Sequence, residues 1–249
     1  MTKNEALELI RANIVTYGHH LYLVQGGPNP RYIYSIGLRD TIGAELILAG
    51  AAFYSANQGF EVVRRLASML KESSSRSEAD YSLRELGTFS LREVHPTWSS
   101  KLILGALDYY KVSVVPALQI VPEAEHRTID VPNLSQAFSP PSEPIWQWLE
   151  NSWDYQVPKN SKVITSLDAL HGAPITEAAR WEETDWELFP GCATDVAKED
   201  MRAVPFGTLL GADPSLRPVT ELMVGKALRR EPGEVEWSPW GSSSSDDDE

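Results

Sequence analysis

A proline-rich segment at residues 139–144 separates two parts of the sequence that differ in charge and in aromatic content. Proline disrupts helix interiors and central strands, so three prolines in six residues mark a break in regular structure. Residues 1–149 hold 13 Lys and Arg against 15 Asp and Glu, a net charge of −2, and residues 150–249 hold 9 against 20, a net charge of −11. Seven of the eight tryptophans lie beyond residue 145. The sequence therefore predicts two domains.

The segment suggests where the domains begin and end. We expect a first domain over residues 1–138, a linker rich in Pro and Trp over 139–158, and a smaller second domain over 159–240. The tail at 241–249 is one glycine followed only by Ser, Asp and Glu, so it has no apolar surface to offset the entropy of ordering. We expect that tail to be disordered.

The first half mixes helical and strand-like patterns. Apolar residues recur at helical spacing over residues 4–16, 54–71 and 99–110. Short apolar or alternating runs, typical of strands, occupy residues 21–24, 32–36, 46–49, 88–94 and 113–121. Glycine and proline between the first two runs predict a hairpin turn. Since strands follow one another before a helix intervenes, we predict an α+β domain around a central, mostly antiparallel sheet.

The second half has shorter strands and more frequent turns. We predict strands over residues 162–166, 175–180, 185–189, 204–206 and 224–229, with one helical turn at 208–210. The second domain is therefore expected to be small, acidic and rich in β-sheet.

Charge limits the classes of partner. The whole chain carries 22 Lys and Arg against 35 Asp and Glu, a formal charge of −13 at pH 7. Nucleic acids and anionic membranes bind stripes of Lys and Arg, so we expect neither as a partner. An acidic surface instead favours a basic protein. The oligomeric state stays open.

Three features point to the cytoplasm. No apolar run reaches the roughly 18 residues of a membrane span. The first residues, 1–5, lack the basic and apolar regions of a signal peptide. The single cysteine, Cys192, cannot form a disulfide within the chain, which agrees with a reducing compartment.

The common catalytic and nucleotide-binding signatures do not occur in the sequence. Gly-x-Gly-x-x-Gly, phosphate loops, His-Glu-x-x-His and Gly-x-Ser-x-Gly are all absent. Weaker candidates are the adjacent His19 and His20, His126 near Asp130, and the thiol of Cys192. Adjacent strand residues point to opposite faces, and the other two lack further ligands or a base nearby in the sequence. We therefore assign no catalytic residue, metal or cofactor, and the sequence favours a protein that is not an enzyme.

Several short motifs in the first half follow one another in a recognisable order. They are YGHH at 17–20, YIYSIGL at 32–38, ELILAG at 45–50, DYY at 108–110 and ALQIVPE at 117–123. In this order they resemble the bacterial family called domain of unknown function 4262, over residues 8–132. Family members usually show a glycine and an aromatic residue after the first histidine, where this chain has His20 and Leu21. The resemblance implies a domain and not a reaction.

A second set of motifs lies in the acidic half. It comprises GAPI at 172–175, DWELFPG at 185–191, VPFGTLL at 204–210, DPSL at 213–216 and ALRR at 227–230. Residues 162–240 are thereby similar to the family called domain of unknown function 2185, which is often grouped with immunity proteins of bacterial toxin systems. The acidic stretch usual in that family is reduced here to Asp195, Glu199 and Asp200. The resemblance implies a binding role.

Our leading hypothesis is a non-enzymatic interaction protein, such as the immunity partner of a bacterial toxin. Its acidic, Trp-rich second domain would cover a basic surface, because an aromatic anchor among carboxylates suits such a contact. The contact residues would be Glu182, Glu183, Asp185, Trp186 and Glu187.

The alternative is an enzyme or a small-ligand-binding protein with its pocket in the first domain. Histidine and tyrosine side chains could act there as acid or base, and an amide could orient a carbonyl. The pocket would be lined by His19, Tyr34, Gly37, Tyr110 and Gln119. A third possibility is a scaffold in which the first domain only dimerises.

Overall fold

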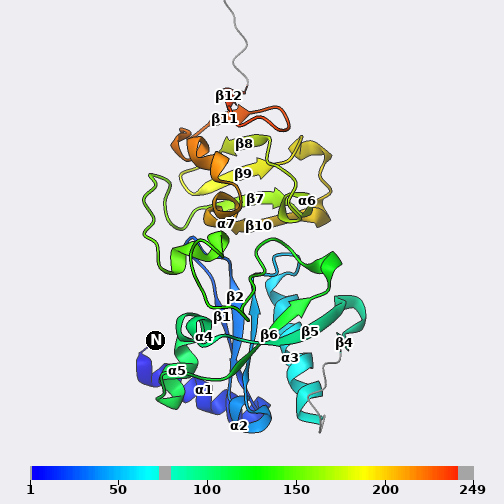
Figure 1. Ribbon diagram of the computed structural model, residues 1–249, viewed down its shortest axis with the longest axis vertical. Helices are drawn as coiled ribbons and strands as arrows, with labels where there is room; N and C mark the ends of the chain where they lie inside the picture. Colours follow the sequence, from blue (N-terminus) through cyan, green and yellow to red (C-terminus); the bar gives the residue numbers. More distant parts are fainter. Residues whose placement is uncertain (1, 73–79, 241–249) are drawn as a thin grey trace, which may run out of the picture. The chain divides into compact units, whose positions relative to one another are not determined.

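The structure is a computed structural model that describes residues 2–72 and 80–240 (Figure 1). Its contacts group into two compact units. Unit 1 comprises Met1–Gln25 and Arg31–Glu143, and unit 2 comprises Gly26–Pro30 and Pro144–Glu249. The tail at 241–249, which was predicted to be disordered, lies outside the described residues.

Unit 1 is built on one six-stranded sheet. Its strands are β1 (His20–Val24), β2 (Tyr32–Ile36), β3 (Glu45–Ala49), β4 (Tyr81–Ser82), β5 (Thr88–Glu93) and β6 (Ala117–Pro122). They lie in the order β1-β2-β3-β6-β5-β4. Only β3 and β6 run parallel, and the other neighbours are antiparallel. The predicted hairpin of β1 and β2 and the mostly antiparallel sheet are confirmed.

Helices cover both faces of this sheet. They are α1 (Lys3–Tyr17), α2 (Arg39–Ile42), α3 (Ala56–Glu72), α4 (Pro96–Leu102) and α5 (Leu104–Tyr110), with short 3-10 turns at Arg84–Leu86 and Ala124–His126. The apolar stripe of α3 packs with Ile33 and Leu48 in the main core. Tyr34, the next residue of β2, points the other way and reaches Gly105 of α5. The sheet is therefore buried between α3 on one face and α5 on the other.

The helix predicted over residues 99–110 is two helices. The break falls at Ile103, whose backbone (φ −105°, ψ 45°) leaves the helical region between α4 and α5. Ile103 is itself fully buried. The apolar periodicity continues across the break, so the sequence pattern does not show it.

Unit 2 holds a second six-stranded sheet. Its strands are β7 (Lys162–Ser166), β8 (Glu177–Arg180), β9 (Asp185–Phe189), β10 (Met201–Pro205), β11 (Lys226–Arg229) and β12 (Ser238–Pro239). Their order is β10-β7-β9-β8-β11-β12, and Figure 1 shows β8, β9, β7 and β10 side by side. The pair β7 and β9 is parallel, while the other pairs are antiparallel. A second unit rich in β-sheet and an α+β chain are thus confirmed.

Short helices complete unit 2. They are α6 (Leu167–Leu170), α7 (Phe206–Ala212), and the 3-10 helices η3 (Pro144–Leu149), η4 (Ala193–Asp195), η5 (Lys198–Asp200) and η6 (Pro214–Glu221). Within residues 2–72 and 80–240, no helix combines the length and the apolar content that crossing a bilayer requires.

Much of the segment predicted as a linker is packed structure. Trp146 of η3 is fully buried, and the indole N–H of Trp148 donates to the carbonyl oxygen of Gly207 at 3.3 Å. Two glycines of α7 allow this approach. A Cβ atom at Gly211 would lie 2.5 Å from the carbonyl oxygen of Pro144, which is backbone and cannot move aside.

We expect Gly211→Ala to destabilise unit 2 by about 1–3 kcal/mol, because the added methyl group must push η3 away from α7. Denaturant unfolding followed by tryptophan fluorescence measures the change, since most of the tryptophans lie in unit 2. Gly191→Ala is the matched control, because a Cβ at Gly191 meets nothing within 4 Å. Equal unfolding midpoints for the two variants would contradict the close packing of α7.

Candidate functional site

Two of the predicted ligand residues, Gly37 and Tyr110, meet at a carboxylate that the sequence analysis did not single out. Glu45 begins β3 and is fully buried. Its Oε1 accepts hydrogen bonds from the hydroxyl of Tyr110 at 2.6 Å and from two backbone N–H groups, of Gly37 at 2.9 Å and Arg39 at 3.1 Å. Its Oε2 accepts from the hydroxyl of Ser35 at 2.5 Å and from the backbone N–H of Leu38 at 3.3 Å.

This carboxylate holds the turn that leads from β2 into α2. Gly37 has φ 110°, and a Cβ there would lie 2.9 Å from Ile14 Cγ1, so the turn requires glycine. Burial and the negative charge of Glu45 raise the pKa of Tyr110, so its hydroxyl stays protonated and donates. Because five hydrogen-bond donors already surround Glu45, we interpret the role of this cluster as structural: it stabilises the turn.

Tyr34 and Gln119 also use their polar atoms to hold the fold. The hydroxyl oxygen of Tyr34 accepts from the backbone N–H of Gly105 at 3.1 Å, and its ring stacks with Tyr22 at 5.5 Å. The buried amide of Gln119 donates to the carbonyl oxygen of Pro132 at 2.7 Å and accepts from the backbone N–H of Leu134 at 3.1 Å. None of Tyr34, Gly37, Tyr110 and Gln119 is among the residues that line the cavity at His19.

His19 lines a cavity of about 560 Å³ beside β1, an edge strand of the sheet, and its backbone adjoins Gly37, where a Cβ would lie 3.4 Å from His19 Cα. His19 is only 9% exposed to solvent. Its Nδ1 is buried and has no side-chain hydrogen-bond partner among the described residues, and the backbone of Tyr17 bonds to the ring. The cavity is lined by Asn13, Tyr17, His19, His20, Leu21, Phe60 and Arg64.

Positive charge surrounds His19. Burial, and then the charges of Lys71, Arg64 and His20, lower the pKa of His19 to about 4, so its ring is neutral at pH 7. Burial also lowers the pKa of His20, whose Nδ1 accepts from the side-chain amide of Asn13 at 2.8 Å. The site thus combines two neutral imidazoles with two permanent cations from α3.

The other candidates for metal or nucleophilic chemistry are placed separately. His20 bonds to α1, whereas His19 faces the cations of α3. The ring of His126 packs on Phe53 at 4.3 Å, while the buried Asp130 accepts from the backbone N–H of Ala52. Cys192 is exposed. In the part of the chain that the structure describes, no three His, Cys, Asp or Glu side chains gather in a way that could hold a metal ion.

The structure corrects one predicted contact residue of unit 2. Trp186 is 1% exposed, with its ring 4.9 Å from Phe206 and the guanidinium of Arg180 4.8 Å above it. Alternation along β9 explains this, because Trp186 faces the core while Asp185 is exposed and Glu187 is half-buried on the other face. Trp186 therefore cannot be the anchor that a partner touches.

Trp181, in the turn between β8 and β9, is an exposed aromatic residue of unit 2. Trp181 is 57% exposed and is followed by the exposed Glu182 and Glu183. Met223 (68% exposed) and Val224 (52%) lie in the loop before β11. We call these residues, with Asp185 and Glu221, the Trp181 surface.

Arg180 holds the two loops of the Trp181 surface together. Its guanidinium donates to the carbonyl oxygen of Leu222 at 2.9 Å and to that of Glu183 at 3.0 Å. Its own carbonyl oxygen accepts from the backbone N–H of Gly225 at 2.7 Å. Arg180 thus packs on the buried ring of Trp186 and hydrogen-bonds to both loops. This arrangement places the exposed side chains of Trp181, Met223 and Val224 beside carboxylates.

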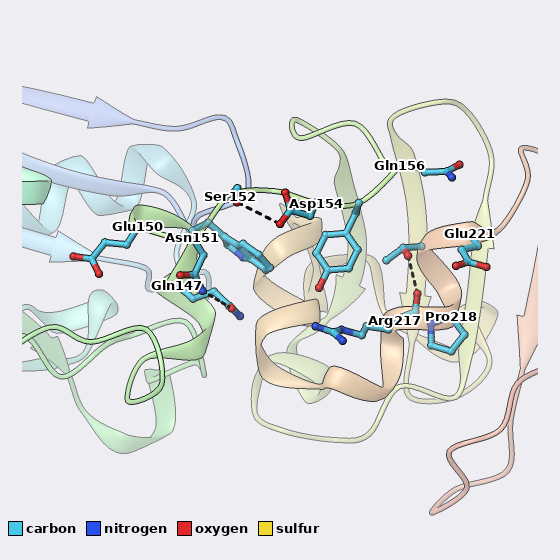
Figure 2. A pocket seen from close by; sticks show the side chains of 12 residues that line it. Gln147, Glu150, Asn151, Ser152, Asp154, Gln156, Arg217, Pro218 and Glu221 are labelled. Atoms are coloured by element: carbon cyan, nitrogen blue, oxygen red, sulfur yellow. Dashed lines mark hydrogen bonds between the residues drawn. The ribbon is translucent and has the colours of Figure 1, made fainter.

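A groove of about 1010 Å³ in the same unit adjoins this surface at Glu221 (Figure 2). Gln147 and Asn151 line one wall, and Arg217 and Glu221 of η6 line the other. The remaining lining includes the carboxylates of Glu150 and Asp154 and the aromatic rings of Trp148 and Tyr155. Three carboxylates and one guanidinium are among the residues that line the groove, so its net charge is negative.

Comparison with known proteins gives one family. Residues 13–127 match the model of the family described as Domain of unknown function (DUF4262), which confirms the resemblance of the first part of the chain. The matched segment includes every residue that lines the cavity at His19. No curated protein matches the chain, and no solved structure matches it.

Proposed function

We propose that the protein binds a basic partner protein through unit 2, with Trp181 at the centre of the contact. The observation that carries this proposal is the grouping of Trp181, Met223 and Val224, all exposed, in two loops that Arg180 ties together. Buried aromatic anchors supply most of the energy of protein interfaces, and methionine adapts to the shape of a partner. An exposed cluster of this kind is typical of a binding surface.

The charge around these apolar side chains supports a basic partner. Glu182, Glu183, Asp185 and Glu221 flank them, and the groove adds Glu150 and Asp154. The cations placed near them are Arg180, Lys162 and Lys226 at the same end of the sheet and Arg217 in the groove, four against six carboxylates. Since residues 150–249 carry a net charge of −11, the field of unit 2 attracts a basic protein and speeds its encounter.

The class of partner comes from resemblance. The motifs of residues 162–240 suggest a resemblance to the family called domain of unknown function 2185 that the family comparison does not show, and on that resemblance we propose a bacterial toxin as the partner and its neutralisation as the role. An immunity protein acts where its toxin would act, and the free thiol of Cys192 suits the reducing cytoplasm. We place the protein there.

Affinity capture from lysate of the source organism tests the proposal. The tagged wild-type chain should retain one basic protein at low salt and lose it at high salt, because salt screens the charges that guide encounter. Trp181→Ala should weaken binding of that purified protein by about thirtyfold, the effect of truncating an interface anchor worth about 2 kcal/mol.

Two matched valine variants distinguish a specific effect of the Trp181 surface on binding from a general effect of losing exposed apolar area. Val224→Ala removes the same atoms as Val235→Ala, and both valines are exposed, but Val235 lies in the loop between β11 and β12. Only Val224→Ala should weaken binding. The proposal is wrong if Trp181→Ala binds the captured protein as tightly as wild type does. It is also wrong if the wild-type chain retains that protein equally at low and high salt.

A further inference from the structure

We propose that the cavity between α1, β1 and α3 is a binding site for the oxyanion group of a small molecule, a carboxylate or a phosphate, and that His19 and Arg64 hold that group. The site lies in unit 1 and is independent of the Trp181 surface of unit 2. Its volume of about 560 Å³ suits a small metabolite.

The first argument is the state of His19. Buried polar atoms in folded proteins nearly always have a hydrogen-bond partner, and each exception calls for an explanation. His19 lines the cavity, its Nδ1 has no side-chain partner, and the backbone of Tyr17 is the one group among the described residues that bonds to its ring. The ring can therefore take a further partner, which a ligand atom in the cavity would supply.

The second argument is charge. Arg64 lines the cavity and makes no hydrogen bond or ion pair with another described residue, apart from lying 5.5 Å from the ring of Phe60. Lys71 lies about two helical turns beyond Arg64 in α3, and its positive charge also lowers the pKa of His19. No carboxylate is among the residues that line the cavity. Glu61, the acidic residue nearest to Arg64 in the sequence, is bound by Arg65 at 2.6 Å.

The same charges argue against a metal ion in the cavity. A cation would face Arg64 and Lys71 without a carboxylate to offset them. Nδ1 of His20 is already occupied by the amide of Asn13. A guanidinium with free N–H groups beside an imidazole is instead the usual chemistry for binding carboxylate or phosphate oxygens.

Binding of an anion should take up a proton. The groups that face His19 are Tyr17 and Asn13 of α1, His20 of β1, and Arg64 and Lys71 of α3, and none of them carries negative charge at neutral pH. An anion beside His19 offsets the cations, and so it raises the pKa of His19 above its ligand-free value of about 4. Affinity should therefore rise as the pH falls from neutral toward that value.

Titration of the full chain with sulfate, inorganic phosphate and acetate tests the site, with the imidazole signals of His19 followed by NMR at constant ionic strength. We expect a saturable shift of the His19 signals and tighter sulfate binding at lower pH, since sulfate itself does not titrate in this range. Binding of phosphate and sulfate alone would identify a phosphoryl ligand, and binding of acetate a carboxylate.

Neighbouring arginines provide the matched control. Arg64→Gln should weaken anion binding about tenfold, as expected for loss of a charge-assisted contact, because Arg64 lines the cavity. Arg65→Gln removes the same charge one residue along α3, but Arg65 is bound to Glu61 and does not line the cavity, so it should have little effect. Both arginines are exposed, so both variants should fold. Equal effects of the two variants, or no saturable shift with any of the anions, would overturn the proposal.

Discussion

Glu45→Ala is expected to destabilise unit 1 by about 3–5 kcal/mol. The change removes the acceptor of two hydroxyl groups and three backbone N–H groups. A buried donor that loses its acceptor still pays the free-energy cost of desolvation, and no hydrogen bond offsets that cost any longer. The N–H of Gly37 keeps the hydroxyl of Tyr110 as an acceptor at 2.9 Å, but the N–H groups of Leu38 and Arg39 lose theirs, so the turn into α2 should open.

Graded variants test this account. Glu45→Gln should lose less than Glu45→Ala, because its amide keeps one acceptor oxygen and the hydroxyl groups of Ser35 and Tyr110 can rotate to accept from its NH₂ group. Ser35→Ala should cost about 2–3 kcal/mol, since it removes a hydrogen bond to a charged group and the acceptor of the buried backbone N–H of Leu46. Calorimetry gives the stabilities, and hydrogen exchange should show the loss over residues 32–49 and not over residues 162–189. A wild-type melting temperature for Glu45→Ala would refute the structural role of the carboxylate.

Trp186→Ala is expected to destabilise unit 2 by about 3–5 kcal/mol, the usual cost of emptying the space of a large buried ring. Trp186 packs between Phe206 and the guanidinium of Arg180, so its removal also takes support from the Trp181 surface. Trp181→Ala should change the free energy of unfolding by less than about 0.5 kcal/mol, because Trp181 is exposed.

Comparing the two tryptophans separates stability from partner contact. Denaturant unfolding followed by circular dichroism should show a lower midpoint for Trp186→Ala alone, and Trp186→Phe should recover part of the loss by refilling the space. Partner binding should be weakened by Trp181→Ala in a fully folded protein. If Trp181→Ala unfolds as readily as Trp186→Ala, the assignment of one ring to the surface and the other to the core is incorrect.

Local patterns were sufficient for most of the regular elements. The strands β2, β7 and β9 have the bounds that alternation or an apolar run predicts, and α3 follows its apolar stripe. The strands β4 and β12 were not predicted, because two residues are too few to show a period. The break at Ile103 was missed because both neighbouring helices keep the same apolar spacing.

The candidate sites were less predictable. The pattern D-W-E-L-F in β9 places Trp186 opposite its acidic neighbours, so strand alternation could have identified Trp186 as a core residue. Glu45 gives no such signal, because an acidic residue at the start of a strand is usually solvated. His19 was included in the predicted pocket, but its cationic neighbours come from α3, which lies about fifty residues further along the chain.

The sequence by itself determined most of the elements, the α+β class and the contrast between a nearly neutral half and a strongly acidic half, since composition and periodicity are local properties. Only the tertiary structure decided which polar groups meet. Tyr110 and Gly37 are 73 residues apart, and Tyr110 and Glu45 are 65 apart, yet their atoms lie within hydrogen-bond distance. Such contacts depend on how strands and helices pack, and no local pattern encodes them. The buried cluster around Glu45, the cationic cavity at His19 and the exposure of Trp181 all result from this tertiary packing.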